Sequence, residues 1–186
     1  MKKIIYILGP SRSGSSALEN YLHDNGHGIA HGEIRWYFKR GIIDDEKCCC
    51  GKYFNQCKFW KKTIDDKVDP IFADKLRSKF DNPVYLAFGY FFKTKDFIEY
   101  KKIISNLYKK LFLKSEIIID NSKSPLYLFI LNIIFSNQNI SIISLHLNRD
   151  IYGLIDSYSK HKRRIESKTE KYMTKKSPTK TILYWV

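Results

Sequence analysis

Residues 4–16 read Ile4-Ile5-Tyr6-Ile7-Leu8-Gly9-Pro10-Ser11-Arg12-Ser13-Gly14-Ser15-Ser16, and this stretch decides the fold. An unbroken apolar run that ends at Gly-Pro is typical of a buried parallel strand. The loop of small residues after it opens a helix that we predict over Ser13–Leu22. Strand, loop and helix in this order are the beginning of an α/β fold.

Further along the chain, apolar patterns of strand and helix type continue to alternate. Apolar residues at helical spacing predict a helix over Phe97–Leu113, Ile117–Ile119 is predicted to be a second buried strand, and Ile140–Leu147 is predicted to be a third strand. Pro125 begins a predicted helix that runs to Ile134, and Asp150 can cap another that runs toward Ser159. We therefore expect an α/β, three-layer, P-loop-like fold with a central parallel sheet flanked by helices.

Two segments lie outside this alternation. Gly26–Asn82 is predicted to be a long irregular insertion, and it contains all the cysteines and most of the tryptophans. Insertions at the carboxyl ends of parallel strands usually shape a substrate site. The chain becomes polar after about residue 165, and its apolar tail, Thr181–Val186, is a candidate for a last strand.

Composition indicates one domain with anionic partners. The 186 residues, 44% of them hydrophobic, suit a single domain over residues 1–186. The net charge of +14 favours nucleotides, sulfated sugars, nucleic acid or an acidic membrane surface, although a lysine-rich solvated surface explains part of it. Ile4–Leu8 is too short for a signal peptide and Leu126–Phe135 too short to span a bilayer, so no transmembrane segment is expected.

The four cysteines, Cys48, Cys49, Cys50 and Cys57, crowd into one stretch. A secreted disulfide scaffold would scatter them, so a reducing, cytoplasmic location is the better interpretation. Thiolates are good zinc ligands, but the stretch lacks two cleanly spaced ligand pairs. We therefore expect no metal, and a structural role for the cysteines around an acceptor pocket.

The loop after the first strand has the features of an anion site, since backbone N–H groups and the helix dipole favour a bound anion there. Its glycines match the triphosphate-binding pattern G-x-x-x-x-G-K-[ST], but Ser15 replaces the lysine and the cation stands inside the loop. A kinase needs that lysine together with magnesium, whereas loop amides, hydroxyls and one guanidinium suffice for a phosphosulfate. The alternative is a glycine-serine turn without a ligand. The candidate binding residues are Ser11, Arg12, Ser13, Gly14, Ser15 and Ser16.

The loop resembles the 5′-phosphosulfate loop of sulfotransferases that use 3′-phosphoadenosine 5′-phosphosulfate (PAPS). Ser144–Tyr158 resembles the same family's 3′-phosphate segment, which is a strand, then Arg-Asp, then a helix with a serine. The resemblance implies that Arg149 and Ser157 hold the 3′-phosphate. The alternative for Arg149 is an ion pair with a nearby carboxylate such as Asp150.

Two further pieces resemble the carbohydrate-type and bacterial branches of that family: residues 31–35 with 50–60, and residues 120–125. The resemblance covers roughly residues 4 to 160, and because members are usually longer, the chain looks short at its C-terminus. It implies that Glu33 is the catalytic base; the alternative is a surface glutamate paired with Arg35. His31 is the second candidate base, since its ordinary pKa suits proton transfer near neutrality.

Lys123 follows the second predicted buried strand and should lie at the same sheet edge as the loop, where it would neutralise the leaving phosphate; the alternative is an ordinary surface lysine. The expected function is transfer of a sulfuryl group from PAPS to a hydroxyl-bearing small molecule or glycan, with a carbohydrate favoured. The alternatives are a P-loop nucleotide kinase or NTPase, a non-catalytic basic nucleotide- or nucleic-acid-binding module, and a shortened, inactive relative. Nucleic acid is not an expected partner, because no nucleic-acid motif is present.

Overall fold

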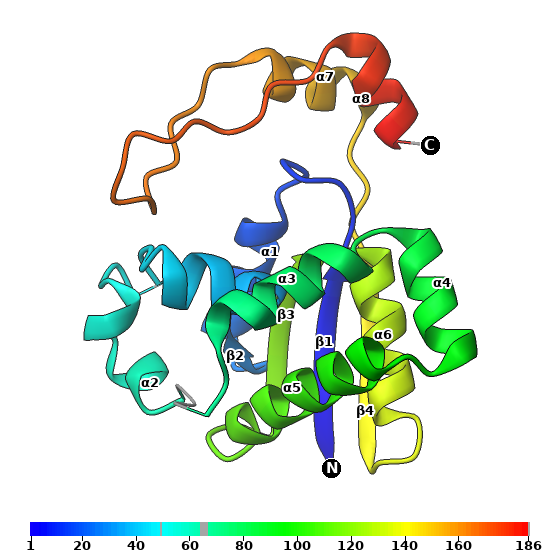
Figure 1. Cartoon of the computed structure of the whole chain (residues 1–186). Helices are drawn as coiled ribbons and strands as arrows, with labels where there is room; N and C mark the ends of the chain where they lie inside the picture. The colour runs from blue at the N-terminus through cyan, green and yellow to red at the C-terminus, as the bar shows by residue number, and fades with distance from the viewer. Residues whose placement is uncertain (49, 64–66, 186) are drawn as a thin grey trace.

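The computed structural model describes residues 1–48, 50–63 and 67–185, with side chains up to residue 182. Its centre is a parallel sheet of four strands in the order β2-β3-β1-β4 (Figure 1). The predicted α/β class with a central parallel sheet is thereby confirmed. The strands are β1 (Lys2–Leu8), β2 (Ile29–Ala30), β3 (Ile117–Lys123) and β4 (Ile140–His146).

Strand β1 lies between β3 and β4 and is covered on both faces. Ile4 pairs with Ile118 of β3 on one side and with Ile142 of β4 on the other. Tyr6 points to the same face as Ile4, Ile7 points to the opposite face, and all three side chains are fully buried. This explains why the strand is apolar without alternation.

Helices cover both faces of the sheet. In Figure 1, α5 (Lys95–Leu111) and α6 (Pro125–Phe135) lie in front of it, together with α3 (Pro70–Phe80) and α4 (Pro83–Phe92), and α1 (Ser15–Asp24) lies behind it. The helices predicted at the positions of α1, α5 and α6 are confirmed, with ends shifted by a few residues. The helix α4 was not predicted.

The connections after β1 and β3 run in opposite directions. The chain leaves β1 through α1 toward β2, and it leaves β3 through α6 toward β4. Right-handed crossovers in opposite directions place the two helices on opposite faces of the sheet. The carboxyl ends of β1 and β3 therefore form the topological switch point of the sheet, where α/β proteins usually bind ligands.

The insertion is more regular than the sequence indicated. Asp69 accepts a hydrogen bond from the backbone N–H of Ile71 and Pro70 occupies the first turn, so α3 has a strong start signal. The prediction of irregular structure up to Asn82 is wrong for α3. Short helical segments also occupy Ile34–Trp36, Tyr37–Ile43, Phe54–Gln56 and α2 (Lys58–Lys61).

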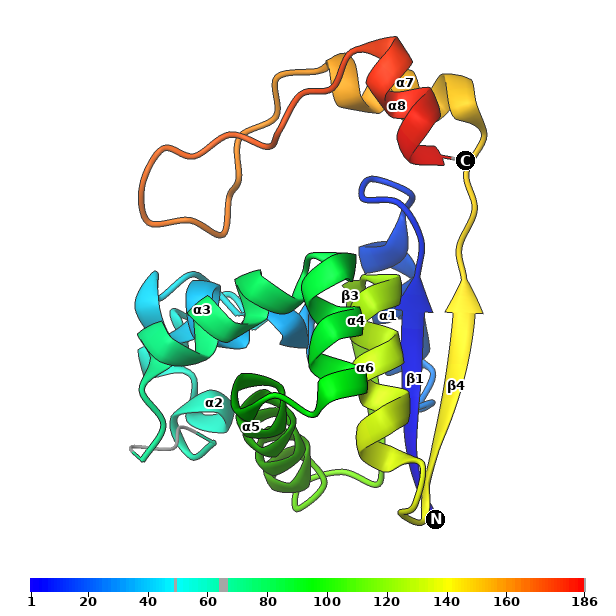
Figure 2. The same cartoon turned by 45° about the vertical axis from the view of Figure 1, so that its right-hand side comes forward.

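The C-terminal part lies beyond the carboxyl edge of the sheet (Figure 2). As predicted, Asp150 caps α7 (Ile151–Ser159), accepting a bond of 2.7 Å from the N–H of Gly153. The predicted last strand is wrong, because α8 (Pro178–Trp185) occupies the tail: proline suits a first helical turn, and the preceding Ser177 hydroxyl accepts a bond from the N–H of Lys180.

The polar segment between α7 and α8 is tied to the insertion. The N–H of Lys47 donates to the carbonyl of Glu166 over 2.8 Å, and Arg164 pairs with the buried carboxylate of Glu46 over 2.6 Å. Within the described residues, no helix combines the length and apolar character that crossing a membrane requires.

Candidate functional site at the carboxyl edge of the sheet

The glycine-serine loop, residues 9–16, leaves β1 through a tight approach to the segment after β4. The N–H of Leu147 donates to the carbonyl of Leu8 over 2.8 Å. Gly9 has a φ of 143°, and a Cβ there would lie 2.3 Å from the carbonyl oxygen of Leu147, so only glycine fits. The loop then turns through Arg12, whose φ of 68° is also left-handed, and Gly14 caps α1.

Two arginines connect the loop to α7. The guanidinium of Arg149 donates to the carbonyl of Arg12 over 2.7 Å. The Arg12 guanidinium in turn donates to the carbonyl of Ser157 and lies 5.1 Å from the centre of the Tyr158 ring. Ser157 is buried. The structure thus brings Arg12 together with two candidate residues that lie about 140 positions further along the chain.

Two polar atoms in the loop are buried without a hydrogen-bond partner among the described residues: Ser13 Oγ and one terminal nitrogen of Arg12. Such atoms are uncommon in folded proteins and call for an explanation. An anion at the loop would satisfy both of them. Of the other candidate loop residues, Ser15 is buried, whereas Ser11, Gly14 and Ser16 are exposed.

Gly153 makes room for Arg149 against α7. A Cβ at Gly153 would lie 3.1 Å from Arg149 Nε and 2.6 Å from the Asp150 carboxylate. A larger residue at this position would displace the guanidinium that contacts the loop.

At the end of β3, Lys123 and Glu33 form an ion pair. Lys123 Nζ lies 2.5 Å from Glu33 Oε1, and Arg40 donates to Glu33 Oε2 over 2.7 Å. Burial alone would raise the pKa of Glu33, but Lys123 and Arg40 together outweigh burial and hold this pKa below its ordinary value. Arg35, the alternative partner of Glu33, instead donates to the carboxylate of Asp81 over 2.9 Å.

Lys123 lies at the sheet edge predicted for it. It pairs in register with Leu8, the residue before the glycine-serine loop, and its φ of 64° is left-handed. Its side chain is 11% exposed. Lys123 is therefore not an ordinary surface lysine.

The segment that carries Glu33 runs along the end of β3. The N–H of His31 donates to Ile119, the N–H of Asn121 donates to Gly32, and the N–H of Arg35 donates to Ser122 Oγ, over 3.1, 2.9 and 3.0 Å. The two sequence pieces around His31 and Lys123 are thus held side by side by backbone bonds.

Glu19 is a positioning residue that the sequence analysis missed. Its carboxylate, buried in α1, accepts bonds from the N–H of Gly32 over 2.6 Å and from the Asn121 side chain over 2.9 Å. Burial raises its pKa. As the single acidic residue of the predicted helix Ser13–Leu22, Glu19 stood out in the sequence, but nothing there indicated its partners.

His31 is held in an apolar environment. Its ring is in edge contact with Phe59 and Trp60, at centroid distances of 5.1 and 5.8 Å, and its Nδ1 lies 2.7 Å from the carbonyl oxygen of Ile29. Burial lowers the pKa of His31 to about 4. His31 is buried with its Nδ1 beside the carbonyl of Ile29, whereas the Glu33 side chain is 28% exposed beside Lys123, so Glu33 is the better placed of the two candidate bases.

Asp120 is a second acid near the end of β3, but it faces the core. Its carboxylate accepts bonds from the Tyr108 hydroxyl and from the N–H of Ser122, and it is fully buried. Burial raises its pKa to about 7.

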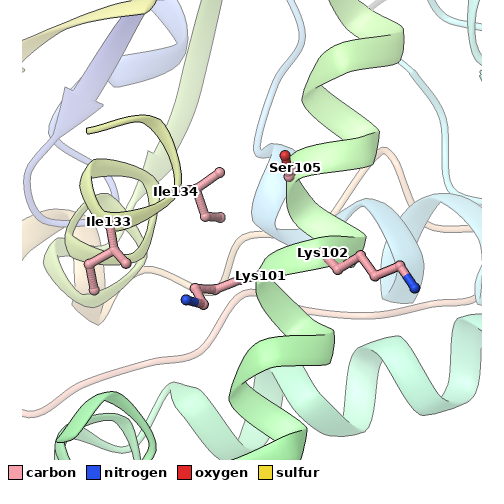
Figure 3. Close-up of a pocket in the computed structure, with 5 residues that line it drawn as sticks. All are labelled: Lys101, Lys102, Ser105, Ile133 and Ile134. Atoms are coloured by element: carbon pink, nitrogen blue, oxygen red, sulfur yellow. The ribbon is translucent and has the colours of Figure 1, made fainter. Parts of the chain in front are cut away.

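A surface hollow of about 220 Å³ lies between α5 and α6, away from this site. Figure 3 shows Lys101 extending toward α6 and Lys102 pointing away from it. The hollow is lined by Lys101, Lys102, Ser105, Ile133 and Ile134. Because α6 runs back from the carboxyl edge, Ile133 and Ile134 lie toward the opposite edge of the sheet, and we assign the hollow no role in the site.

The structure is that of an α/β protein with a glycine-serine loop, a candidate anion site, where the carboxyl ends of two neighbouring parallel strands meet. Comparison of the chain with protein-family models, with curated proteins and with solved structures found no match in any of the three. A functional assignment therefore rests on the residues described above.

Proposed function

We propose that this chain is a sulfotransferase that takes a sulfuryl group from PAPS. One observation carries the proposal: the two segments that resemble the 5′- and 3′-phosphate segments of that family meet, through the bond from Arg149 to the carbonyl of Arg12. A nucleotide with phosphates at both positions is the ligand that needs both segments. The P-loop-like character of the fold is part of the same proposal.

The residues suit the two phosphates of PAPS. At the 5′ side, Ser13 Oγ and the terminal nitrogen of Arg12 lack partners among the described residues, and the N-terminus of α1 adds backbone donors. At the 3′ side we assign Arg149 and the buried Ser157. Ser15, which stands where a triphosphate loop has its lysine, makes the nucleotide kinase or NTPase the weaker alternative.

PAPS would supply the sulfuryl group, and Lys123 and Glu33 would serve its transfer to a hydroxyl. Glu33 takes the proton of the acceptor hydroxyl, and Lys123 stabilises charge on the leaving phosphate. Contact of Lys123 with a phosphate would weaken its hold on Glu33. The pKa of Glu33 would then rise toward its ordinary value and make the carboxylate a stronger base, because Lys123 and Arg40 are what lower it.

The acceptor is assigned by position. The insertion that carries Glu33 lies beside the carboxyl end of β3, and we assign it the binding of a hydroxyl-bearing small molecule or glycan, preferably a carbohydrate. The cytoplasmic location and the absence of a nucleic-acid partner stay predictions.

The test is the thermal stabilisation of the protein by nucleotides. Adenosine 3′,5′-bisphosphate without metal should raise the melting temperature, and Arg149→Ala should abolish most of this shift while leaving the smaller shift from adenosine 5′-phosphosulfate unchanged. Stabilisation by ATP only with magnesium would favour the kinase alternative. A melting temperature that responds equally to any polyanion and falls steeply with salt would favour the basic binding module.

A further inference from the structure

Three cysteine thiols of the insertion converge on one point. Cys57 Sγ lies 3.7 Å from Cys50 Sγ and 3.8 Å from Cys48 Sγ, and all three sulfur atoms lie within 4.8 Å of one another. Cys57 is buried, Cys48 is half-buried and Cys50 is exposed. Cys49 lies outside the described residues.

Backbone bonds hold the three thiols in place. Cys48 and Cys50 belong to a tight hairpin in which the N–H of Cys48 donates to Lys52 over 2.8 Å and the N–H of Gly51 donates to Cys48 over 2.9 Å. Cys57 immediately precedes α2, and its N–H donates to the carbonyl of Tyr53 over 2.9 Å. The sulfur atoms therefore come from two separate turns that the backbone fixes against each other.

The spacing of the sulfur atoms matches that of zinc ligands. Zinc–thiolate bonds are about 2.3 Å long, and two ligands of a tetrahedral zinc are then about 3.8 Å apart. A disulfide would need sulfur atoms at about 2.05 Å, and it would use only two of the three thiols. The sequence lacks two cleanly spaced ligand pairs, but the fold brings Cys48 and Cys50 next to Cys57, so the spacing no longer argues against a metal site.

We propose that Cys48, Cys50 and Cys57 bind one zinc ion as thiolates, with a fourth position open to solvent beside the exposed Cys50. Three thiolates and Zn²⁺ carry a net charge of −1. The exposed Lys52 and Lys58 next to the ligands in the sequence offset this charge.

Zinc at this position braces the wall of the candidate site. Cys57 begins the turn of α2 that carries Phe59 and Trp60, and both rings pack against His31, two residues before Glu33. The Trp60 ring is also stacked on Phe54, with centroids 4.8 Å apart. The metal thus fixes the hairpin and α2 from the outside, and it needs no part in sulfuryl transfer.

The test is metal content and cobalt spectroscopy of the full chain, purified under reducing conditions with added zinc and then dialysed. We expect one zinc per chain, and after exchange with Co²⁺ an absorption band from thiolate-to-cobalt charge transfer. Cys50→Ser should lower the zinc affinity at least tenfold without unfolding the protein, because Cys50 is exposed. Cys57→Ser should do the same, with circular dichroism as the check on its fold.

Gln56→Ser is the matched control, since it changes an exposed, uncharged side chain next to Cys57 and leaves all thiols in place. It should retain zinc. Less than one zinc per two chains in the wild type, unchanged affinity in both cysteine variants, or a cobalt complex without the charge-transfer band would each overturn the proposal. None of these results depends on nucleotide binding, so failure here is distinguishable from failure of the proposed function.

Discussion

The ion pair between Glu33 and Lys123 can be measured without knowledge of the acceptor. A double-mutant cycle compares Glu33→Gln, Lys123→Met and the double variant, each of which keeps the approximate side-chain volume. The two side chains are 28% and 11% exposed, and the charged atoms are 2.5 Å apart. The pair therefore lies between an exposed pair, which contributes about 0.2–1 kcal/mol, and a buried pair, where removal of one partner costs about 3–5 kcal/mol.

We expect Lys123→Met to lower the free energy of unfolding by about 2 kcal/mol, toward the smaller limit because Glu33 keeps Arg40 as a partner. The coupling between the two positions should be about 1 kcal/mol. Lys123→Gly removes the same ammonium but also relieves a left-handed φ of 64°, so it should cost about 1 kcal/mol less than Lys123→Met.

Urea unfolding followed by circular dichroism gives the four free energies of the cycle. A coupling below about 0.3 kcal/mol, within the scatter of independent sites, would show that the pair does not form in solution. The assignment of Glu33 and Lys123 to one site would then lose its structural support.

Asp120→Asn should flatten the pH dependence of stability. Burial raises the pKa of Asp120 in the folded protein from 3.8 to about 7, so the free energy of unfolding of the wild type falls as the pH rises from about 4 to 7. A urea midpoint whose pH dependence is the same in the variant would contradict this. Gly153→Ala should displace Arg149 and weaken adenosine 3′,5′-bisphosphate at least tenfold by calorimetry, whereas equal affinity would separate Arg149 from the ligand. Glu46→Ala leaves Arg164 without its buried partner, so limited trypsin digestion should cleave residues 160–177 faster than in the wild type; equal rates would show that the segment is held otherwise.

The sequence predicted the two central strands well because β1 and β3 are largely buried, whereas the short edge strand β2 was not predicted. A continuous apolar run such as Ile4–Leu8 has few alternatives when Gly-Pro ends it. The apolar tail was mistaken for a strand because periodicity is ambiguous over six residues, and the start signal at Pro178 lay outside the run. The insertion was predicted to be irregular because most of its helical segments are short. The helix α3 was missed although Pro70 and the apolar residues Ala73, Leu76 and Phe80 at helical spacing indicate it.

The position of a site residue was predictable where the end of a strand determines it. Arg149 and Lys123 each follow a strand of one parallel sheet, so their arrival at the same edge follows from topology. Glu19 and Arg40 were missed because their partners come from distant segments, and no local pattern specifies such contacts. The convergence of the cysteines depends likewise on the hairpin that precedes Cys57.

Backbone strain gives an independent reason to connect Arg12 and Lys123 with function. Among the described residues, four non-glycine residues have a positive φ. One of them, Lys93, ends α4, where a left-handed residue is common, and Asp45 is of a type that tolerates this conformation. Arg12 and Lys123 have no such local reason: they are long cations held at about 1–2 kcal/mol of strain each, one in the loop after β1 and the other at the last residue of β3. Glycine would relieve the strain at both positions, so under the proposed function we expect the two charges to be kept because the ligand carries two anionic groups.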